Sequence, residues 1–138
     1  MTRDTPPAII RINPPELGAP PGYSQVVTVS TSRMIFIAGQ TALDSAGRVV
    51  GGTDFAAQAD QVFRNLGVAL GASGCTAANL VKLTVFLTDM NHLGLYREAR
   101  NRFFASVTPP AAPAVTLVEV SKLYGAEFMI EIEAIAAE

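Results

Sequence analysis

The sequence predicts a single α+β domain with the element order β-β-β-α-β-α-β-β. Short runs rich in Val, Ile and Thr are bounded by Gly and Pro clusters, as strands are. Two other segments repeat apolar residues with helical spacing. With 138 residues, of which 49% are hydrophobic and 16% charged, the chain has the length and composition of one domain, 1–138, around one core.

The N-terminal part is predicted to supply three strands. Residues 1–22 hold six of the nine prolines and form a Pro-rich lead-in, with a first strand at 8–12. Val- and Ile-rich runs follow at 25–30 and 34–39, separated by the short segment 31–33. Because two such runs with a short break are typical of a β-hairpin, we expect these two strands to pair with each other.

Two amphipathic helices are predicted next. The first starts at Thr53 or Asp54, either of which can cap it, and ends at Gly71 to Gly74. The second covers about 93–105, after a capping segment that begins at Asp89. Prolines beyond residue 108 end it.

Three further strands complete the predicted sheet. The run 80–88 is apolar on both faces at its end, which indicates a central strand. Segments 113–120 and 130–136 read as two adjoining strands that carry carboxylates. Two helices can cover only one face of a six-stranded sheet, so the other apolar face predicts a homo-oligomer.

Charge and composition exclude several kinds of protein. The formal net charge is −2, and the ten Lys and Arg residues are scattered, which argues against nucleic acid as a partner. The lone Cys75 allows no intramolecular disulfide, and the N-terminus has no signal-peptide pattern, so we expect a cytoplasmic protein. No apolar run reaches membrane-spanning length. One histidine, His92, without a Cys cluster makes a metal site improbable.

Sequence blocks along almost the whole chain resemble the reactive intermediate deaminase family, also called RidA or YjgF. In chain order they are GYSQ at 22–25, IAGQ at 37–40, AQA at 57–59 with NL at 65–66, VKLTVFLTDM at 81–90, FF at 103–104, PA at 113–114, VEV at 118–120 and IEIEA at 130–134. The resemblance implies a chorismate-mutase-like fold, with a six-stranded sheet, two helices on one face, and a homotrimer around a central barrel with clefts between subunits. It also implies hydrolysis of enamines and imines, such as 2-aminoacrylate, to 2-keto acids and ammonia without a metal or cofactor.

Several positions that bind substrate in the family differ here. The resemblance places Val115 where active members have the arginine that binds the substrate carboxylate. Ala38 replaces a small hydroxyl residue, and Leu117 replaces a cysteine or similar small residue. Arg97 stands at an asparagine position. An apolar residue cannot pair with a carboxylate, so the usual mode of substrate binding is not expected.

Other family positions are retained. Glu131 matches the glutamate that positions water, and Tyr23 matches an early tyrosine of the site. Gly39 would still offer backbone groups to a ligand, and Thr116 lies between the two altered positions of the fifth strand. The resemblance therefore implies a site that keeps its water-positioning group and has lost part of its polar anchoring.

Arg97 and Arg100 share one face of the second predicted helix with Leu93 and Phe104. They are candidates for a relocated clamp that binds a ligand carboxylate. The alternative is that both are solvated or form salt bridges between subunits.

Three functions remain open at this point. The first is a divergent hydrolase or deaminase of an imine, enamine or related compound, with Glu131 positioning water in an intersubunit cleft. The second is a non-catalytic small-molecule-binding or regulatory trimer, which Ala38, Val115 and Leu117 favour. The third, a ribonuclease or translation inhibitor, is disfavoured by the pI of about 5.4 and the lack of a basic stripe.

Overall fold

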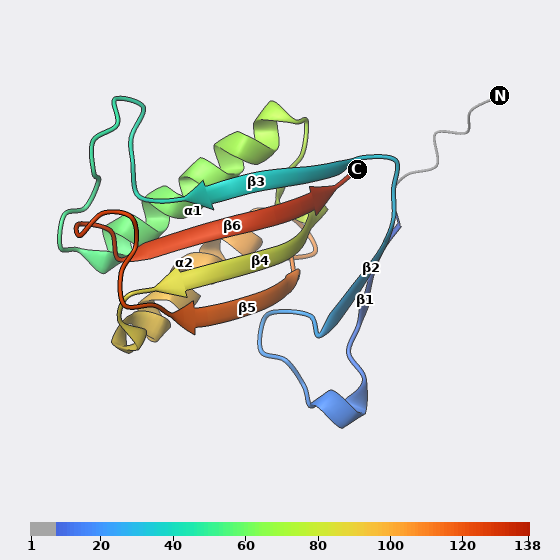
Figure 1. The fold of residues 1–138 in the computed structure, drawn as a ribbon. Coiled ribbons are helices and arrows are strands. Elements are labelled where there is room, and N and C mark those ends of the chain that lie inside the picture. The colour runs from blue at the N-terminus through green and yellow to red at the C-terminus, as the bar shows by residue number, and fades with distance from the viewer. Residues whose placement is uncertain (1–7) are drawn as a thin grey trace.

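The computed structural model describes residues 8–138, which follow the predicted element order (Figure 1). The elements are β1 (Ala8–Ile12), β2 (Val26–Ser30), β3 (Met34–Gln40), α1 (Phe55–Ala72), β4 (Leu80–Leu87), α2 (Leu93–Phe104), β5 (Ala114–Glu119) and β6 (Ile130–Ala137). Short 3₁₀ turns precede β4 and α2. The first seven residues of the predicted Pro-rich lead-in lie outside the described part of the chain.

The six strands form two sheets, so the prediction of one six-stranded sheet is wrong. The larger sheet has the order β3-β6-β4-β5, in which only β4 and β5 run parallel. The smaller sheet is the antiparallel pair β1-β2. In Figure 1 this pair runs obliquely away from one end of the larger sheet. β4 is a central strand, as predicted.

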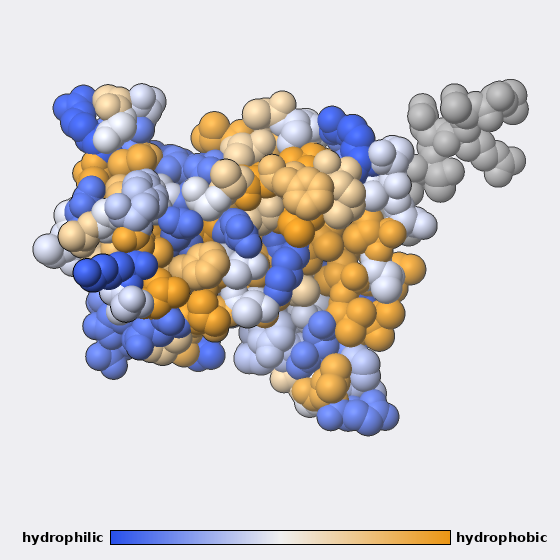
Figure 2. Space-filling model, viewed as in Figure 1, coloured by the Kyte–Doolittle hydropathy of each residue, from blue (hydrophilic) through white to orange (hydrophobic). Residues whose placement is uncertain are grey.

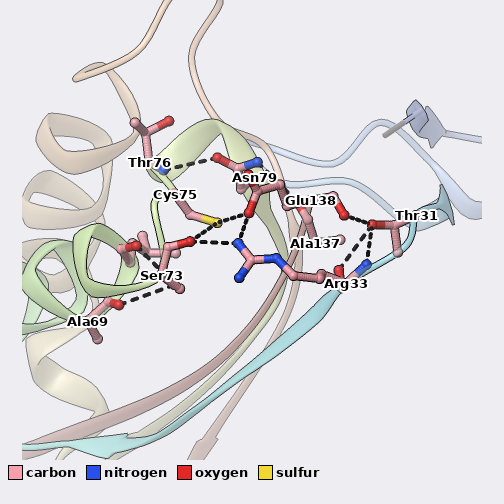
Figure 3. A network of polar contacts seen from close by, with 10 residues as sticks. Thr31, Arg33, Ala69, Ser73, Cys75, Thr76, Asn79, Ala137 and Glu138 are labelled. Atoms are coloured by element: carbon pink, nitrogen blue, oxygen red, sulfur yellow. Dashed lines mark hydrogen bonds and ion pairs between the residues drawn. The ribbon is translucent and has the colours of Figure 1, made fainter. Parts of the chain in front are cut away.

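The predicted hairpin between 25–30 and 34–39 is also wrong. β2 pairs with β1, and β3 pairs with β6 at the far end of the sequence. The segment between them is held by the C-terminal residue: the backbone of Arg33 exchanges two 3.0 Å hydrogen bonds with Glu138, and the two side chains form an ion pair. Arg33 also donates to Ser73 O at 2.7 Å (Figure 3). These contacts fix the position of the segment that connects β2 of the smaller sheet with β3 of the larger sheet.

Both helices pack on the same face of the larger sheet (Figure 1). Asp54 caps α1 by accepting a hydrogen bond from Ala57 N at 3.3 Å, which confirms one of the two predicted starts. The alternating pattern of β4 and β6 sends every second side chain into the core between sheet and helices. The buried members include Leu83, Val85, Ile132 and Ala134.

The opposite face of the larger sheet carries exposed apolar side chains. In the part of the chain that the structure describes, no helix covers this face. Phe36 is 73% exposed, Met34 48% and Val118 39%. Figure 2 shows this face, where apolar patches lie between hydrophilic side chains. Within residues 8–138, no helix is long and apolar enough to cross a bilayer.

Candidate functional site

A cavity of about 230 Å³ lies between α2, β5 and the segment before β2. It is lined by Tyr23, Leu93, Tyr96, Arg97, Arg100, Val115 and Leu117. Five of these seven residues are ones that the sequence singles out as site candidates. Residues far apart in the chain thus meet at one place.

The position of each wall follows from the strand pattern and one loop anchor. Val115 and Leu117 pair with the buried Leu83 and Val85 of β4, so their side chains point to the helix-covered face. Tyr23 is brought to the cavity because the next residue, Ser24, is fixed to the chain ahead of β5. Its N–H donates to Pro113 O at 3.0 Å and its hydroxyl donates to Ala112 O at 2.5 Å.

The Arg100 guanidinium is buried, although its charge has no carboxylate partner among residues 8–138. Its Nε and Nη2 donate to Asn101 Oδ1 at 3.2 and 3.1 Å, and Nη2 also reaches Pro21 O at 3.4 Å. The guanidinium carbon lies 5.8 Å from the Tyr96 ring centre and 5.9 Å from that of Phe104. A buried charge without a counter-ion is costly, so this cavity is suited to an anion.

Arg97 differs from Arg100 in its surroundings. It is exposed, whereas Arg100 is 6% exposed. Both arginines line the cavity, as the predicted clamp requires. Arg97 is a surface cation, whereas Arg100 is a buried one.

Tyr96 is a cavity residue that sequence reasoning missed. It is 1% exposed, and its hydroxyl interacts with the Arg100 guanidinium without reaching the geometry of a normal hydrogen bond. Burial raises the pKa of Tyr96 to about 12, against the opposing effects of the Arg100 charge, of a side-chain hydrogen bond with Arg100 and of the Arg97 charge. The raised pKa extends the range in which the hydroxyl keeps its proton to higher pH than for a free tyrosine. Its position four residues before Arg100, on the same helix face, is the one sequence signal that could have found it.

Glu131 lies on the other face of the sheet. On β6 it is the cross-strand partner of Phe86. Its neighbours Ile130 and Ile132 are buried under the helices, and side chains alternate along a strand, so Glu131 points away from the helices. The register of β3 shifts between Ile37 and Gln40, and this irregularity brings Gly39 against the Glu131 carboxyl group. A side chain at position 39 would collide with that group, so any other residue there requires the Glu131 side chain to shift.

A second cavity, of about 290 Å³, surrounds Glu131. Its other walls are Phe86, Val120, Lys122, Leu123 and Tyr124. Lys122 brings a positive charge to it. Tyr124 is held in place by a 2.6 Å hydrogen bond between its hydroxyl and Thr41 Oγ1 and by the Phe128 ring 4.7 Å away. Lys122 and Tyr124 were not predicted from the sequence, since neither lies in a recognisable pattern.

The remaining candidates also lie on the helix-free face. Ala38 lines a third hollow, together with Lys82, Thr84 and Glu133. The Thr116 hydroxyl accepts a hydrogen bond from Lys82 Nζ at 2.6 Å. Because successive residues of a strand point to opposite faces, a single copy of the chain separates Thr116 and Glu131 from the arginine cavity.

A family model described as Endoribonuclease L-PSP matches residues 15–138, so the chain belongs to this family, which includes the RidA and YjgF proteins. Rat 2-iminobutanoate/2-iminopropanoate deaminase (Rattus norvegicus) is 40% identical over 126 residues, which cover 91% of this chain and 84% of the relative.

Two solved structures of relatives show the same fold. A Rid family protein of unknown function from Yersinia pestis, YyfB, aligns with a TM-score of 0.83 and 31% identity over 94% of this chain and 98% of that one. E. coli TdcF, crystallised with bound serine, aligns with a TM-score of 0.70 and 30% identity over 88% of this chain and 91% of that one.

Proposed function

We propose that this protein hydrolyses an imine or enamine that carries a carboxylate, in a cleft formed between two copies of the chain in a homotrimer. The observation that carries the proposal is the buried Arg100, which faces a cavity and lacks a carboxylate partner among residues 8–138. Support comes from the imine deaminase name of the rat relative and from the serine, an amino acid with a carboxylate, bound by TdcF.

The location between copies is supported by the separation of the two half-sites. Arg100 and Arg97 lie on the helix-covered side at β5, whereas Glu131 lies on the open side of β6. The open side also carries exposed apolar residues such as Phe36, which a second copy would bury. We propose a closed ring of three copies in which the Glu131 half of one subunit faces the arginine half of the next.

The chemistry needs few protein groups. Glu131 accepts a proton from a water molecule, whose oxygen attacks the imine carbon. Glu131 returns that proton to the imine nitrogen, which gives a carbinolamine. The proton of the carbinolamine hydroxyl group then moves to the nitrogen as the C–N bond breaks, and ammonia leaves. The products are a carbonyl compound and ammonia, and neither a metal nor a cofactor is required for this sequence of steps.

The arginines supply the anion clamp. At the position where the resemblance implies a substrate-binding arginine, this chain has Val115, and loss of a bidentate guanidinium contact costs a few kcal/mol. Arg100 and Arg97 line the same cavity as Val115 and bring positive charge to it from α2. We infer that the clamp has moved from the strand to the helix.

The role of Glu131 is tested with Glu131→Gln, using Glu133→Gln as the matched control on the same strand and face. The imine is generated in place by a dehydratase acting on serine or threonine, and 2-keto acid release is measured above the spontaneous rate. We expect Glu131→Gln to lose roughly 100-fold or more of the acceleration and Glu133→Gln to keep it. Equal rates for Glu131→Gln and the unmodified protein would remove the proposed role of Glu131.

A second candidate function is a non-catalytic trimer that binds a small molecule. It is favoured by the apolar residues Ala38, Val115 and Leu117 at positions that are polar or small in the family. Val115→Arg separates the two candidates. If only this variant hydrolyses 2-aminoacrylate, the natural cleft serves another ligand; if the unmodified chain also does, the clamp on α2 is sufficient.

A further inference from the structure

We propose that Tyr124 is the main wall of a side-chain pocket beside Glu131, and that this pocket selects imines with a large apolar side chain over the imine of alanine. The inference rests on imine hydrolysis at Glu131 as the proposed function and deepens it. It adds a specificity-determining residue, Tyr124, a residue that positions it, Thr41, and a class of substrate side chain, branched aliphatic or aromatic.

The first support is the composition of the cavity around Glu131. Its apolar walls are Phe86, Val120, Leu123 and Tyr124. A water molecule activated by Glu131 attacks the imine carbon, and the substrate side chain is bonded to that same carbon. The side chain is therefore placed against these walls, which favour aliphatic or aromatic groups.

The second support is the space next to this cavity. A neighbouring hollow of about 460 Å³ lies along the β5–β6 loop and the end of β4. It shares Lys122, Leu123 and Tyr124 with the cavity around Glu131, so the two spaces adjoin at these residues. The methyl group of the alanine imine would leave most of this space unfilled, whereas a larger side chain can cover the Tyr124 ring.

The third support is the fixed position of the Tyr124 ring. The residue is 69% exposed, yet its hydroxyl is hydrogen-bonded to Thr41 Oγ1 at 2.6 Å, and its ring centre lies 4.7 Å from that of Phe128. Ordering a side chain during binding costs free energy. A ring that is already held loses less freedom when a ligand covers it, so Tyr124 is prepared for contact with a ligand.

Both groups that hold the ring are themselves fixed by α1. Thr41 is 4% exposed, and its carbonyl oxygen accepts a hydrogen bond from Asn65 Nδ2 at 3.0 Å. Phe128 is equally buried, and the backbone on its two sides is bonded to the Gln58 side chain at 2.8 and 3.0 Å. The ring therefore stands on two supports that reach the core.

The segment that holds Tyr124 also contacts Glu131. Thr41 follows two residues after Gly39, against which the Glu131 carboxyl group lies. One short segment, 39–41, thus touches both the group that positions water and the residue that forms the pocket wall. This arrangement keeps the Tyr124 ring in a constant relation to the reacting carbon.

Lys122 also lines the cavity and would favour an acidic side chain. It is exposed, and ion pairs at exposed sites contribute little. Apolar surface removed from water contributes in proportion to its area, and four of the walls supply such surface. The apolar class is therefore favoured, and the acidic class is an outcome of the test.

The test compares hydrolysis of the imines of leucine and alanine, generated in place by an amino acid oxidase with catalase present. The quantity measured is the ratio of kcat/KM for the leucine imine to that for the alanine imine. We expect a ratio above one in the unmodified protein and a roughly tenfold lower ratio in Tyr124→Ala, with the alanine imine hydrolysed as before. Val68→Ala is the matched control, since Val68 is also 69% exposed but lies on α1.

Thr41→Val tests whether the hydrogen bond positions the ring. The substitution keeps the size of the side chain and removes the oxygen that bonds to Tyr124. It should lower the same ratio roughly threefold in the unmodified chain and leave it unchanged when combined with Tyr124→Ala. Equal effects in both backgrounds would reject Thr41 as a positioning residue. Because this variant keeps the ring, it tests the pocket even if Tyr124→Ala is unstable.

Binding of the 2-oxo acid products, measured by calorimetry without turnover, separates this inference from the proposed function. 4-Methyl-2-oxopentanoate should bind roughly tenfold more tightly than pyruvate, and Tyr124→Ala should remove this preference. If so, and if Glu131→Gln leaves hydrolysis unchanged, the pocket stands and the hydrolase is rejected. If Glu131→Gln abolishes hydrolysis but Tyr124→Ala keeps both preferences, the hydrolase stands and the pocket is rejected.

Three results would overturn the inference. The first is an unmodified protein that prefers neither the leucine imine nor 4-methyl-2-oxopentanoate. The second is an unchanged or higher ratio in Tyr124→Ala. The third is tighter binding of 2-oxoglutarate than of 4-methyl-2-oxopentanoate, lost in Lys122→Met, which would assign the cavity to an acidic side chain.

Discussion

Gly39 of β3 lies directly against the carboxyl group of Glu131 on the neighbouring strand β6. A Cβ atom at position 39 would stand 2.9 Å from Glu131 Cδ, a distance that real Cβ atoms essentially never show. Gly39 is itself exposed, and the three nearest atoms that a Cβ there would meet all belong to Glu131.

Gly39→Ala is therefore expected to reduce hydrolysis with little effect on stability. The added methyl group must displace the Glu131 carboxyl group. A small misplacement of a catalytic group can lower the rate by roughly tenfold or more. The free energy of unfolding should change by less than about 1 kcal/mol. Gly71→Ala is the control, because a Cβ there meets nothing within 4 Å. If both variants hydrolyse the imine equally well, the contact has no catalytic importance.

Gln58 is expected to be the polar residue on which the stability of the β5–β6 loop depends most. It is fully buried, donates to Gly52 O at 2.7 Å and Glu127 O at 2.8 Å, and accepts from Met129 N at 3.0 Å. Gln58→Ala leaves these backbone groups unpaired and should lower the free energy of unfolding by about 3 kcal/mol, measured by urea denaturation. Gln61→Ala, on the same helix but half-buried, should cost clearly less; equal losses would contradict this role.

Stability at high pH should report on Tyr96. Its pKa in the folded protein is about 12, above the value of 10.0 for a free side chain. Since the folded state holds the proton more tightly, the associated stability is fully present below pH 10 and is lost as the pH rises through 12. The unfolding free energy of Tyr96→Phe should therefore exceed that of the unmodified protein increasingly above pH 10. A difference that does not vary with pH would contradict the burial of this hydroxyl.

Phe36→Asp is expected to break the proposed homotrimer. Phe36 is 73% exposed on the helix-free face of the sheet, where an interface between copies would bury it. Val68→Asp is the control, since Val68 is similarly exposed, at 69%, but lies on α1. Light scattering should show a smaller particle for Phe36→Asp alone, together with a loss of hydrolysis. A trimer that survives Phe36→Asp would place the interface elsewhere.

The elements of the fold were largely predictable from local patterns. The ends of α1 follow from Asp54 and the glycines after Leu70, and the central strand follows from its apolar run. Strand pairing was not predictable in this way, because the short segment 31–33 is equally compatible with a hairpin and with a crossing between sheets. β3 pairs with β6, which lies about 100 residues later in the chain, and no local pattern reports such a distant partner.

The candidate site was predictable in part. The resemblance and the helical spacing of Arg97 and Arg100 were enough to find most of the arginine cavity. The burial of Arg100 was not visible, because a helix position alone does not tell how far an arginine is covered by the loop at Pro21. Tyr96 was missed for a related reason. An aromatic residue at a core-facing helix position is expected only to pack in the core, and the sequence does not show what surrounds its hydroxyl.

The central claim, a site shared between two copies, is tested most directly by mixing two inactive variants. Glu131→Gln and Arg100→Met each remove one half-site, and they are coexpressed with different tags so that mixed trimers can be purified. In each purified mixed trimer, whichever variant is present twice, about one third of the clefts would combine an intact Glu131 half with an intact Arg100 half from the neighbouring subunit. We predict that hydrolysis returns to about that fraction; mixed trimers that remain as inactive as either parent would contradict the account.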